Sequence, residues 1–166
     1  RKLWTHCVDV AATASVLARL CTAQDRDAAF FAGMVHDIGQ FFLLARVWEY
    51  PELLSDDSPL SDLVRVWHPP VGRAVLAAMS MPRELVDAVD NPEIYGGEWP
   101  PTNIPDLIFI ANLVAESRNP FSPEDEDFRQ GLARAATLGL DETRLAQALA
   151  ESAEERHALM ALFHVG

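Results

Sequence analysis

Apolar residues recur at intervals of three and four positions along most of this chain, and that spacing is the strongest constraint on its fold. Between Leu3 and Leu20, for example, apolar side chains stand at Val8, Ala11 and Val16. Such spacing gathers apolar residues on one face of an amphipathic helix. No segment shows a convincing alternation of apolar and polar residues between turn signals, which would indicate a strand. The sequence therefore predicts an all-α protein, an irregular helical bundle without strands.

Capping and breaking residues divide this pattern into separate helices. Asp25 is a suitable N-cap for the second helix. Pro69 and Pro70 fit the first turn of a helix but not its interior, so His68 is expected where one helix ends and the next begins. A loop rich in Gly and Pro is predicted over 91–105. The predicted helices span residues 3–20, 26–48, 60–67, 71–79, 82–89, 104–117, 124–136 and 141–164.

Composition sets the size of the core and excludes some partners. With 166 residues, 49% hydrophobic, the chain can close one core, so residues 1–166 are expected to form a single domain. A formal net charge of −12 disfavours direct binding to nucleic acid or to an anionic membrane surface. No apolar run approaches the length of a membrane span. Cys7 and Cys21 lie too far apart on one helix to pair, and reduced thiols indicate a cytoplasmic protein.

The pair His36-Asp37 is the main candidate for chemistry. It lies in the most apolar stretch of the chain, where a carboxylate is unfavourable unless it is paired, hydrogen-bonded or ligated. Adjacent side chains on a helix point about 100° apart, so both can reach one metal ion. His6 and His68 lie about thirty residues before and after the pair, and Gly39 lets another backbone approach. The residues alone leave open a metal site and a pair of buried, hydrogen-bonded structural groups.

These residues resemble a known family. His6 and then His36-Asp37 resemble the HD superfamily of helical metal-dependent phosphohydrolases, whose members hold a divalent ion with a His, a His-Asp pair and a later Asp. More specifically, residues 4–11 (Trp-Thr-His-Cys-Val-Asp-Val-Ala), 29–39 and 68–72 (His-Pro-Pro-Val-Gly), ending near Met81-Pro82, resemble the HDOD domain. The resemblance runs from Trp4 to about Glu116. It implies a helical module of bacterial signalling and regulation, a branch in which the catalytic ligands are often lost.

Three positions depart from the pattern of the catalytic relatives. The later Asp corresponds to Asn112, which brings no charge to offset a dication. The His-His pair of related sequences falls at Asn91-Pro92 or Pro92-Glu93, so a second metal lacks ligands. Gln40 replaces a Lys that could hold a phosphate. The resemblance thus implies a remnant metal site of His6, His36, Asp37 and Asn112, without an assigned catalytic residue and with His68 and Glu93 as further candidates.

Two functions follow from this pattern. The favoured one is a non-catalytic regulatory module without a cofactor. Its expected partners are other signalling proteins, other domains of its parent chain or a second copy of itself. The alternative is a phosphohydrolase or phosphodiesterase in which iron, manganese, zinc or magnesium on His6, His36 and Asp37 activates water. If the pair is structural, Asp37 should accept a hydrogen bond from His6, from Asn112 or from a backbone N–H.

The resemblance also predicts how the chain relates to a full HDOD domain. HDOD sequences carry a helical segment ahead of the part that begins here with Arg1-Lys2-Leu3. We therefore expect the domain to lack that segment, and the apolar face that it would cover to be exposed or covered by a second copy.

Overall fold

The computed structural model describes residues 1–54, 59–90, 95, 99–122, 135 and 142–163. Among these residues the regular elements are all helical, which confirms the predicted all-α fold. Two 3-10 turns follow the third helix, η1 (Val47–Glu49) and η2 (Pro51–Leu54). The α-helices are α1 (Lys2–Cys21), α2 (Arg26–Val35), α3 (Ile38–Arg46), α4 (Leu60–Ala78), α5 (Arg83–Asp90), α6 (Ile104–Leu113) and α8 (Glu142–Phe163).

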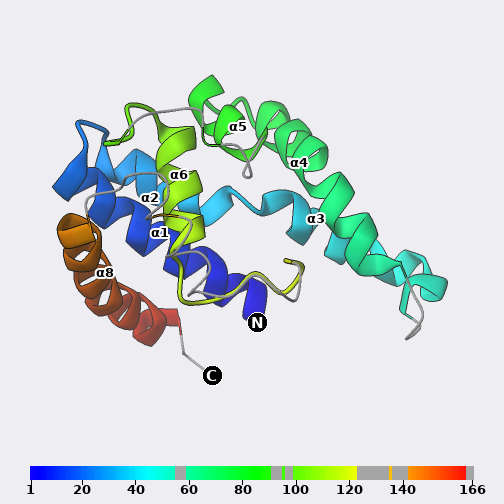
Figure 1. Ribbon diagram of the computed structural model, residues 1–166. Coiled ribbons are helices and arrows are strands. Elements are labelled where there is room, and N and C mark those ends of the chain that lie inside the picture. The colour runs from blue at the N-terminus through cyan, green and yellow to red at the C-terminus, as the bar shows by residue number, and fades with distance from the viewer. Residues whose placement is uncertain (55–58, 91–94, 96–98, 123–134, 136–141, 164–166) are drawn as a thin grey trace.

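Helix α1 lies at the centre of one half of the molecule, with α2, α6 and α8 packed against it (Figure 1). Every residue from His6 to Ala18 is buried. The spacing of apolar residues predicted an amphipathic helix, but neighbouring helices cover most of α1. Its many alanines allow this close packing, and an added Cβ on Gly33 of α2 would lie only 2.5 Å from Ala11 Cα. Such a helix is part of the core rather than of the surface.

Helix α4 shows that tertiary packing can override a helix-breaking signal. It is continuous through Pro69 and Pro70, so the predicted break at His68 is wrong. Each proline removes a backbone hydrogen-bond donor from the helix interior, which is unfavourable in isolation. Packing of α4 against α3 and α5 outweighs that loss. His68 consequently lies in the middle of a helix and is presented to the residues of α3.

Helix α6 begins where a cap predicts and ends earlier than expected. Asn103 caps it, accepting the N–H of Asp106 on Oδ1 at 2.8 Å. The helix was predicted to continue to Ser117 but ends at Leu113. The following residues, up to Ser122, return beside the N-terminal half of α1 instead, where Ser117 contacts both His6 and Asp9.

Helix α8 closes the far side of α1 and matches the helix predicted over 141–164. Among the described side chains of α8, Leu145, Ala148 and Ser152 are buried, and the helix packs against α1. Arg19 pairs with Glu151 at the edge of the same contact. The helix predicted over 124–136 lies almost entirely outside the described residues. Both cysteines are free and buried, as expected from their separation along α1.

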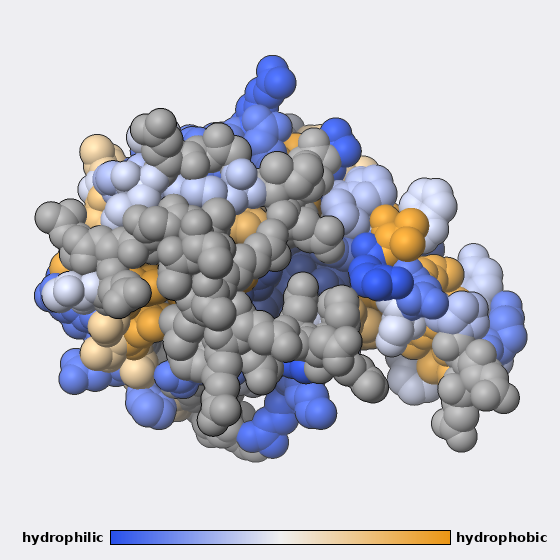
Figure 2. Space-filling model, in the orientation of Figure 1, coloured by the Kyte–Doolittle hydropathy of each residue, from blue (hydrophilic) through white to orange (hydrophobic). Residues whose placement is uncertain are grey.

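Helices α3 and α4 form an arm that extends away from α1, with η1 and η2 near its tip (Figure 1). Large apolar side chains are exposed along it. Trp48 is 75% exposed and Trp67 is 55% exposed. Hydrophobic residues are also visible among hydrophilic ones on this part of the surface (Figure 2). Isolated exposed apolar residues are ordinary, but several large ones on one projecting element are typical of a contact surface.

One stretch of the described residues, Arg26–Glu49, is long and apolar enough to cross a membrane by length and composition alone. The expectation that no run approaches that length is therefore wrong. The core helices of globular proteins pass the same test, and this stretch is interrupted between α2 and α3. At the interruption lie His36 and Asp37, which are buried against other polar groups of the bundle.

Candidate metal centre

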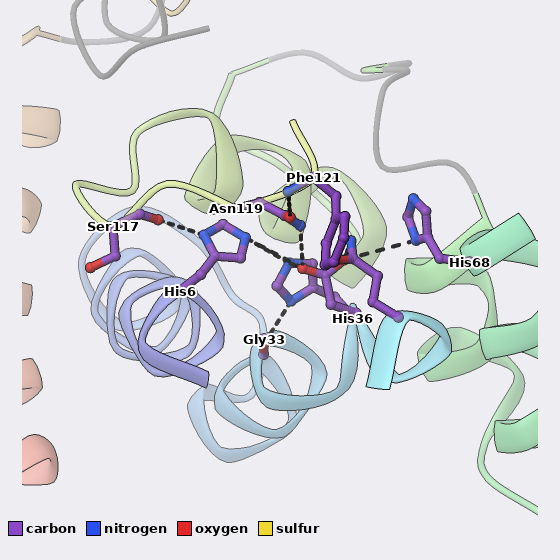
Figure 3. A network of polar contacts seen from close by, with 9 residues as sticks. His6, Gly33, His36, His68, Ser117, Asn119 and Phe121 are labelled. Atoms are coloured by element: carbon purple, nitrogen blue, oxygen red, sulfur yellow. Dashed lines mark hydrogen bonds and ion pairs between the residues drawn. The ribbon is translucent and has the colours of Figure 1, made fainter. Parts of the chain in front are cut away.

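Three side chains from two distant parts of the chain meet in the interior of the bundle (Figure 3). His6 comes from α1, while His36 and Asp37 form the turn between α2 and α3. The Nε2 atoms of His6 and His36 are 3.3 Å apart. Asp37 Oδ2 lies 3.5 Å from His6 Nε2 and 3.2 Å from His36 Nε2. Each of the three residues is only 2% exposed.

The His36-Asp37 pair lies in a turn and not inside a continuous helix as predicted. His36 Nδ1 donates to the Gly33 carbonyl oxygen at 2.7 Å, an acceptor that the backbone N–H of Asp37 would use in a continuous helix. Asp37 then takes the N-cap position of α3, with φ −101° and ψ 18°. The turn directs the Asp37 carboxylate toward His6 on α1. A side-chain hydrogen bond of this local kind competes with the helical pattern, which sequence spacing does not reveal.

Both histidine rings are held with the same nitrogen toward the centre of the cluster. His6 Nδ1 lies 2.6 Å from the Ser117 carbonyl oxygen, as His36 Nδ1 does from that of Gly33. A carbonyl oxygen only accepts, so each Nδ1 must carry a hydrogen. In the neutral rings Nε2 is then a lone-pair atom facing the Asp37 carboxylate. Metal-ligating histidines are commonly oriented by such a bond from their other nitrogen.

The three groups change one another's proton affinity. Burial would raise the pKa of Asp37, but the charge and hydrogen bond of His36, followed by His6 and His68, lower it to about 2. Burial by itself lowers the pKa of His36, whereas the nearby Asp37 carboxylate outweighs it and raises that pKa. Burial and the neighbouring His36 lower the pKa of His6. Without a metal, these shifts favour a proton on His36 over one on His6.

The geometry of the cluster fits a single divalent ion. Atoms bound at about 2.0–2.1 Å to a tetrahedral ion lie about 3.3 Å from one another, and the three distances here are 3.2, 3.3 and 3.5 Å. Two imidazole nitrogens and one carboxylate oxygen suit zinc, iron or manganese. Burial raises the pKa of the adjacent Cys7 thiol, with a further contribution from Asp37, which disfavours a thiolate there when no metal is bound. The residues present thus fit a bound ion.

The carboxylate of Asp37 has different neighbours on its two oxygens. Oδ1 accepts the side-chain N–H of Gln40 at 2.8 Å, and His68 Nδ1 lies 3.9 Å from it. Oδ2, the oxygen that faces the two histidines, also accepts from Asn119 Nδ2 at 2.7 Å. Asn119 is itself oriented by the Phe121 backbone N–H, which donates to its Oδ1 at 2.9 Å (Figure 3). The buried carboxylate is thus hydrogen-bonded on both sides, as a buried charge requires.

Comparison with known protein families identifies the family of this chain. A model of the HDOD domain matches residues 1–94, which is more than half of the chain. This chain belongs to the HDOD domain family. The match ends before Asn112, so it supplies no counterpart for that position.

The HDOD domain also resembles a solved structure. A candidate metal-dependent phosphohydrolase from Shewanella amazonensis superposes with a TM-score of 0.71 at 24% sequence identity. The similarity covers 93% of this chain and 57% of that protein, so the chain spans little more than half of the longer relative. At this identity the likeness concerns the fold alone. A comparison with curated proteins gives no match.

The HDOD domain brings together most, but not all, of the predicted site residues. His6, His36 and Asp37 meet directly, and His68 lies at the edge of the cluster. Within the described part of the chain, the side chain that reaches Asp37 from beyond α6 is Asn119 and not Asn112. Glu93 lies outside the described residues. Of the partners predicted for Asp37, His6 lies nearby, whereas the two side-chain amides that donate to the carboxylate, those of Gln40 and Asn119, were not predicted.

Three contributors to this HDOD site were missed: Asp9, Ser117 and Asn119. Asn119 precedes a proline, and Asn-Pro is a turn signal that could have indicated a loop here, although it does not indicate what the loop contacts. Gln40 was considered only as the loss of a lysine, whereas its amide holds Asp37 Oδ1. Because α6 was predicted to continue to Ser117, the turn that brings Ser117 and Asn119 back to α1 was not expected.

The two asparagines give a direct test of this assignment. We expect Asn119→Ala to lower the free energy of unfolding by about 1.5–3 kcal/mol, because it removes a hydrogen bond to a buried charged group. Asn112→Ala, in a half-buried helical position, should change it by less than about 1 kcal/mol. Urea denaturation followed by circular dichroism measures both. Equal losses for the two variants would contradict the placement of Asn119.

Proposed function

We propose that this HDOD domain is a non-catalytic regulatory module in which His6, His36 and Asp37 hold one divalent ion. The ion would join α1 to the turn between α2 and α3, and the module would act through contacts with other proteins or domains. The observation that carries the proposal is the buried triangle of Nε2, Nε2 and Oδ2 atoms, whose spacing suits one ion. When bound, the ion would supply positive charge beside the buried Asp37 carboxylate.

The surroundings of the triangle favour a structural role over hydrolysis. The three ligand residues are each 2% exposed, which leaves little room for a phosphate ester beside them. The side chain of Gln40 is buried and donates to Asp37 Oδ1, so this position offers an amide where a cation would help to hold a phosphate. Asn119 covers Asp37 Oδ2 from the other direction.

Two further observations support action through protein contacts. The α3–α4 arm carries exposed Trp48, Val66 and Trp67 side chains. Burying these apolar side chains against another protein would be more favourable than leaving them in water. The formal net charge of −12 disfavours nucleic acid and an anionic membrane as partners. We therefore propose signalling proteins of the bacterial cytoplasm, another domain of the parent chain or a second copy as the binding partner.

Metal analysis tests the proposal directly. Protein purified without chelator is expected to contain about one zinc, iron or manganese ion per chain by elemental analysis. It should show no hydrolysis of bis(4-nitrophenyl) phosphate above a metal-only blank. His6→Ala is expected to lose the ion, while His157→Ala, on the exposed surface of α8, should retain it. Metal-free wild-type protein that also binds no added ion would contradict the proposed metal centre.

A phosphohydrolase is the second candidate, because three protein ligands leave one position of a tetrahedral ion open, as in catalytic zinc sites. The same fold in a candidate phosphohydrolase is consistent with that possibility. Phosphoesterase activity that requires the metal and disappears in His6→Ala would favour this candidate over the regulatory module.

A further inference from the structure

Asp9 is a buried carboxylate that the proposed metal centre does not use. It lies on α1 three residues after His6, on the same side of the helix, and is 1% exposed. A carboxylate in such a position is unfavourable unless it is hydrogen-bonded. Its Oδ2 accepts the backbone N–H of Ser117 at 2.5 Å.

Ser117 also accepts a hydrogen bond from the ring of His6. The Ser117 carbonyl oxygen lies 2.6 Å from His6 Nδ1, so two side chains of α1 contact the two polar backbone atoms of one residue. Ser117 lies more than a hundred positions further along the chain, in the segment that follows α6. This segment has no helical hydrogen bonds of its own at Ser117, so its position depends on contacts of this kind.

We propose that Asp9 is a positioning residue for His6, acting through the backbone of Ser117. By holding the Ser117 N–H, the Asp9 carboxylate places the neighbouring carbonyl oxygen where it accepts the His6 Nδ1–H. That bond fixes the ring with the hydrogen on Nδ1 and leaves Nε2 directed at Asp37 and His36. The hydrogen bond from a backbone N–H to a carboxylate is charge-assisted and stronger than a neutral one.

The expected effect of Asp9 on metal affinity rests on the proposed metal centre, but its effect on the His6 ring does not. Groups that orient a ligating histidine typically change metal affinity by about 10–100-fold when they are removed. The ring tautomer of His6, by contrast, can be observed in metal-free protein. Failure of the metal centre and failure of the positioning role are thus separate results.

The test compares wild-type protein with two Asp9 variants, all metal-free and ¹⁵N-labelled, at a pH where the His6 ring is neutral. Long-range ¹H–¹⁵N spectra report which ring nitrogen carries the hydrogen, with His6 assigned from a His6→Gln variant. In wild-type protein His6 should carry it on Nδ1. Asp9→Leu should convert His6 to a mixture of tautomers and weaken Zn²⁺ binding by about 10–100-fold in calorimetric titration. Asp9→Asn, which keeps an acceptor oxygen, should retain the wild-type tautomer.

Two controls separate positioning from loss of stability. His36 is an internal control, since its Nδ1 donates to Gly33, and its ring ¹⁵N signals should not change in any Asp9 variant. Asp106→Asn replaces another buried aspartate, at the start of α6, and should leave the His6 tautomer unchanged. If Asp9→Leu does not fold, Asp9→Ala replaces it, because an alanine cannot reach Ser117. A folded Leu or Ala variant in which His6 keeps its hydrogen on Nδ1 would overturn the inference.

Discussion

Replacement of Asp37 by alanine is expected to abolish metal binding and to lower the free energy of unfolding of the metal-free protein by about 3–5 kcal/mol. The carboxylate accepts from Gln40 and Asn119 and lies beside three histidines. Its removal leaves the buried Gln40 amide and the part-buried Asn119 amide without this acceptor, and it removes the anion that raises the pKa of His36. Urea denaturation in EDTA measures the stability, and titration with Zn²⁺ measures the binding.

An exposed aspartate provides the matched control for this variant. Asp62 pairs with Arg65 at the surface, where its side chain is 74% exposed, so Asp62→Ala should change stability by less than about 1 kcal/mol and leave metal binding intact. Asp37→Asn keeps the shape of the side chain and should recover part of the lost stability without recovering the metal. If Asp37→Ala were as stable as wild type, the buried hydrogen bonds to Asp37 would contribute nothing to folding.

Gly39→Ala is expected to lower the free energy of unfolding by about 3 kcal/mol or more, the upper end of the range for an overpacked core. A Cβ at this position would lie 2.0 Å from the His68 carbonyl oxygen and 2.8 Å from Gly72 N, both atoms of the α4 backbone. Helical backbone cannot yield in the way that the end of a side chain can, so α3 and α4 would have to separate. Thermal and urea denaturation measure the loss.

Ala45 provides the control for Gly39 because it lies on the exposed face of the same helix. Ala45→Val adds more volume than Gly39→Ala, yet it should change stability by no more than about 1 kcal/mol. A Gly39→Ala protein with wild-type stability would show that α3 and α4 are further apart than described. Because His68 lies on α4 beside Gly39, separation of the two helices should also move His68 away from Asp37.

The helical elements were largely predictable from local sequence. The spacing of apolar residues located α1, α5 and α8, and Asp25 caps α2 as predicted, accepting the Ala28 N–H on Oδ1 at 2.7 Å. Helix breaks were less predictable. The helical pattern is interrupted at His36-Asp37, where there is no Pro or Gly, whereas helix α4 continues through Pro69-Pro70. Both outcomes depend on side-chain and interhelical contacts that local propensity does not contain.

The three residues of the central cluster were predictable, but the groups around them were not. His6 and His36-Asp37 were identified from residue types and intervals, because a carboxylate and imidazoles in apolar segments need partners. Gly39 was correctly expected to allow close approach of another backbone, which proves to be that of His68. Asn112 was selected by its alignment with a later Asp, but alignment does not show where a helix ends. Since α6 ends at Leu113, Asn119 faces Asp37.

The sequence by itself determined that this chain is a helical bundle of the HDOD family with a His, His-Asp cluster in its interior. These properties follow from periodicity and from a short motif, both of which are local. Only the tertiary structure decided that the His6 and His36 rings present Nε2 to Asp37, since the bonds that fix them come from Ser117 and Gly33 carbonyl oxygens. A residue more than a hundred positions away can hold a ring in place because folding returns it to α1, and no local pattern records that contact.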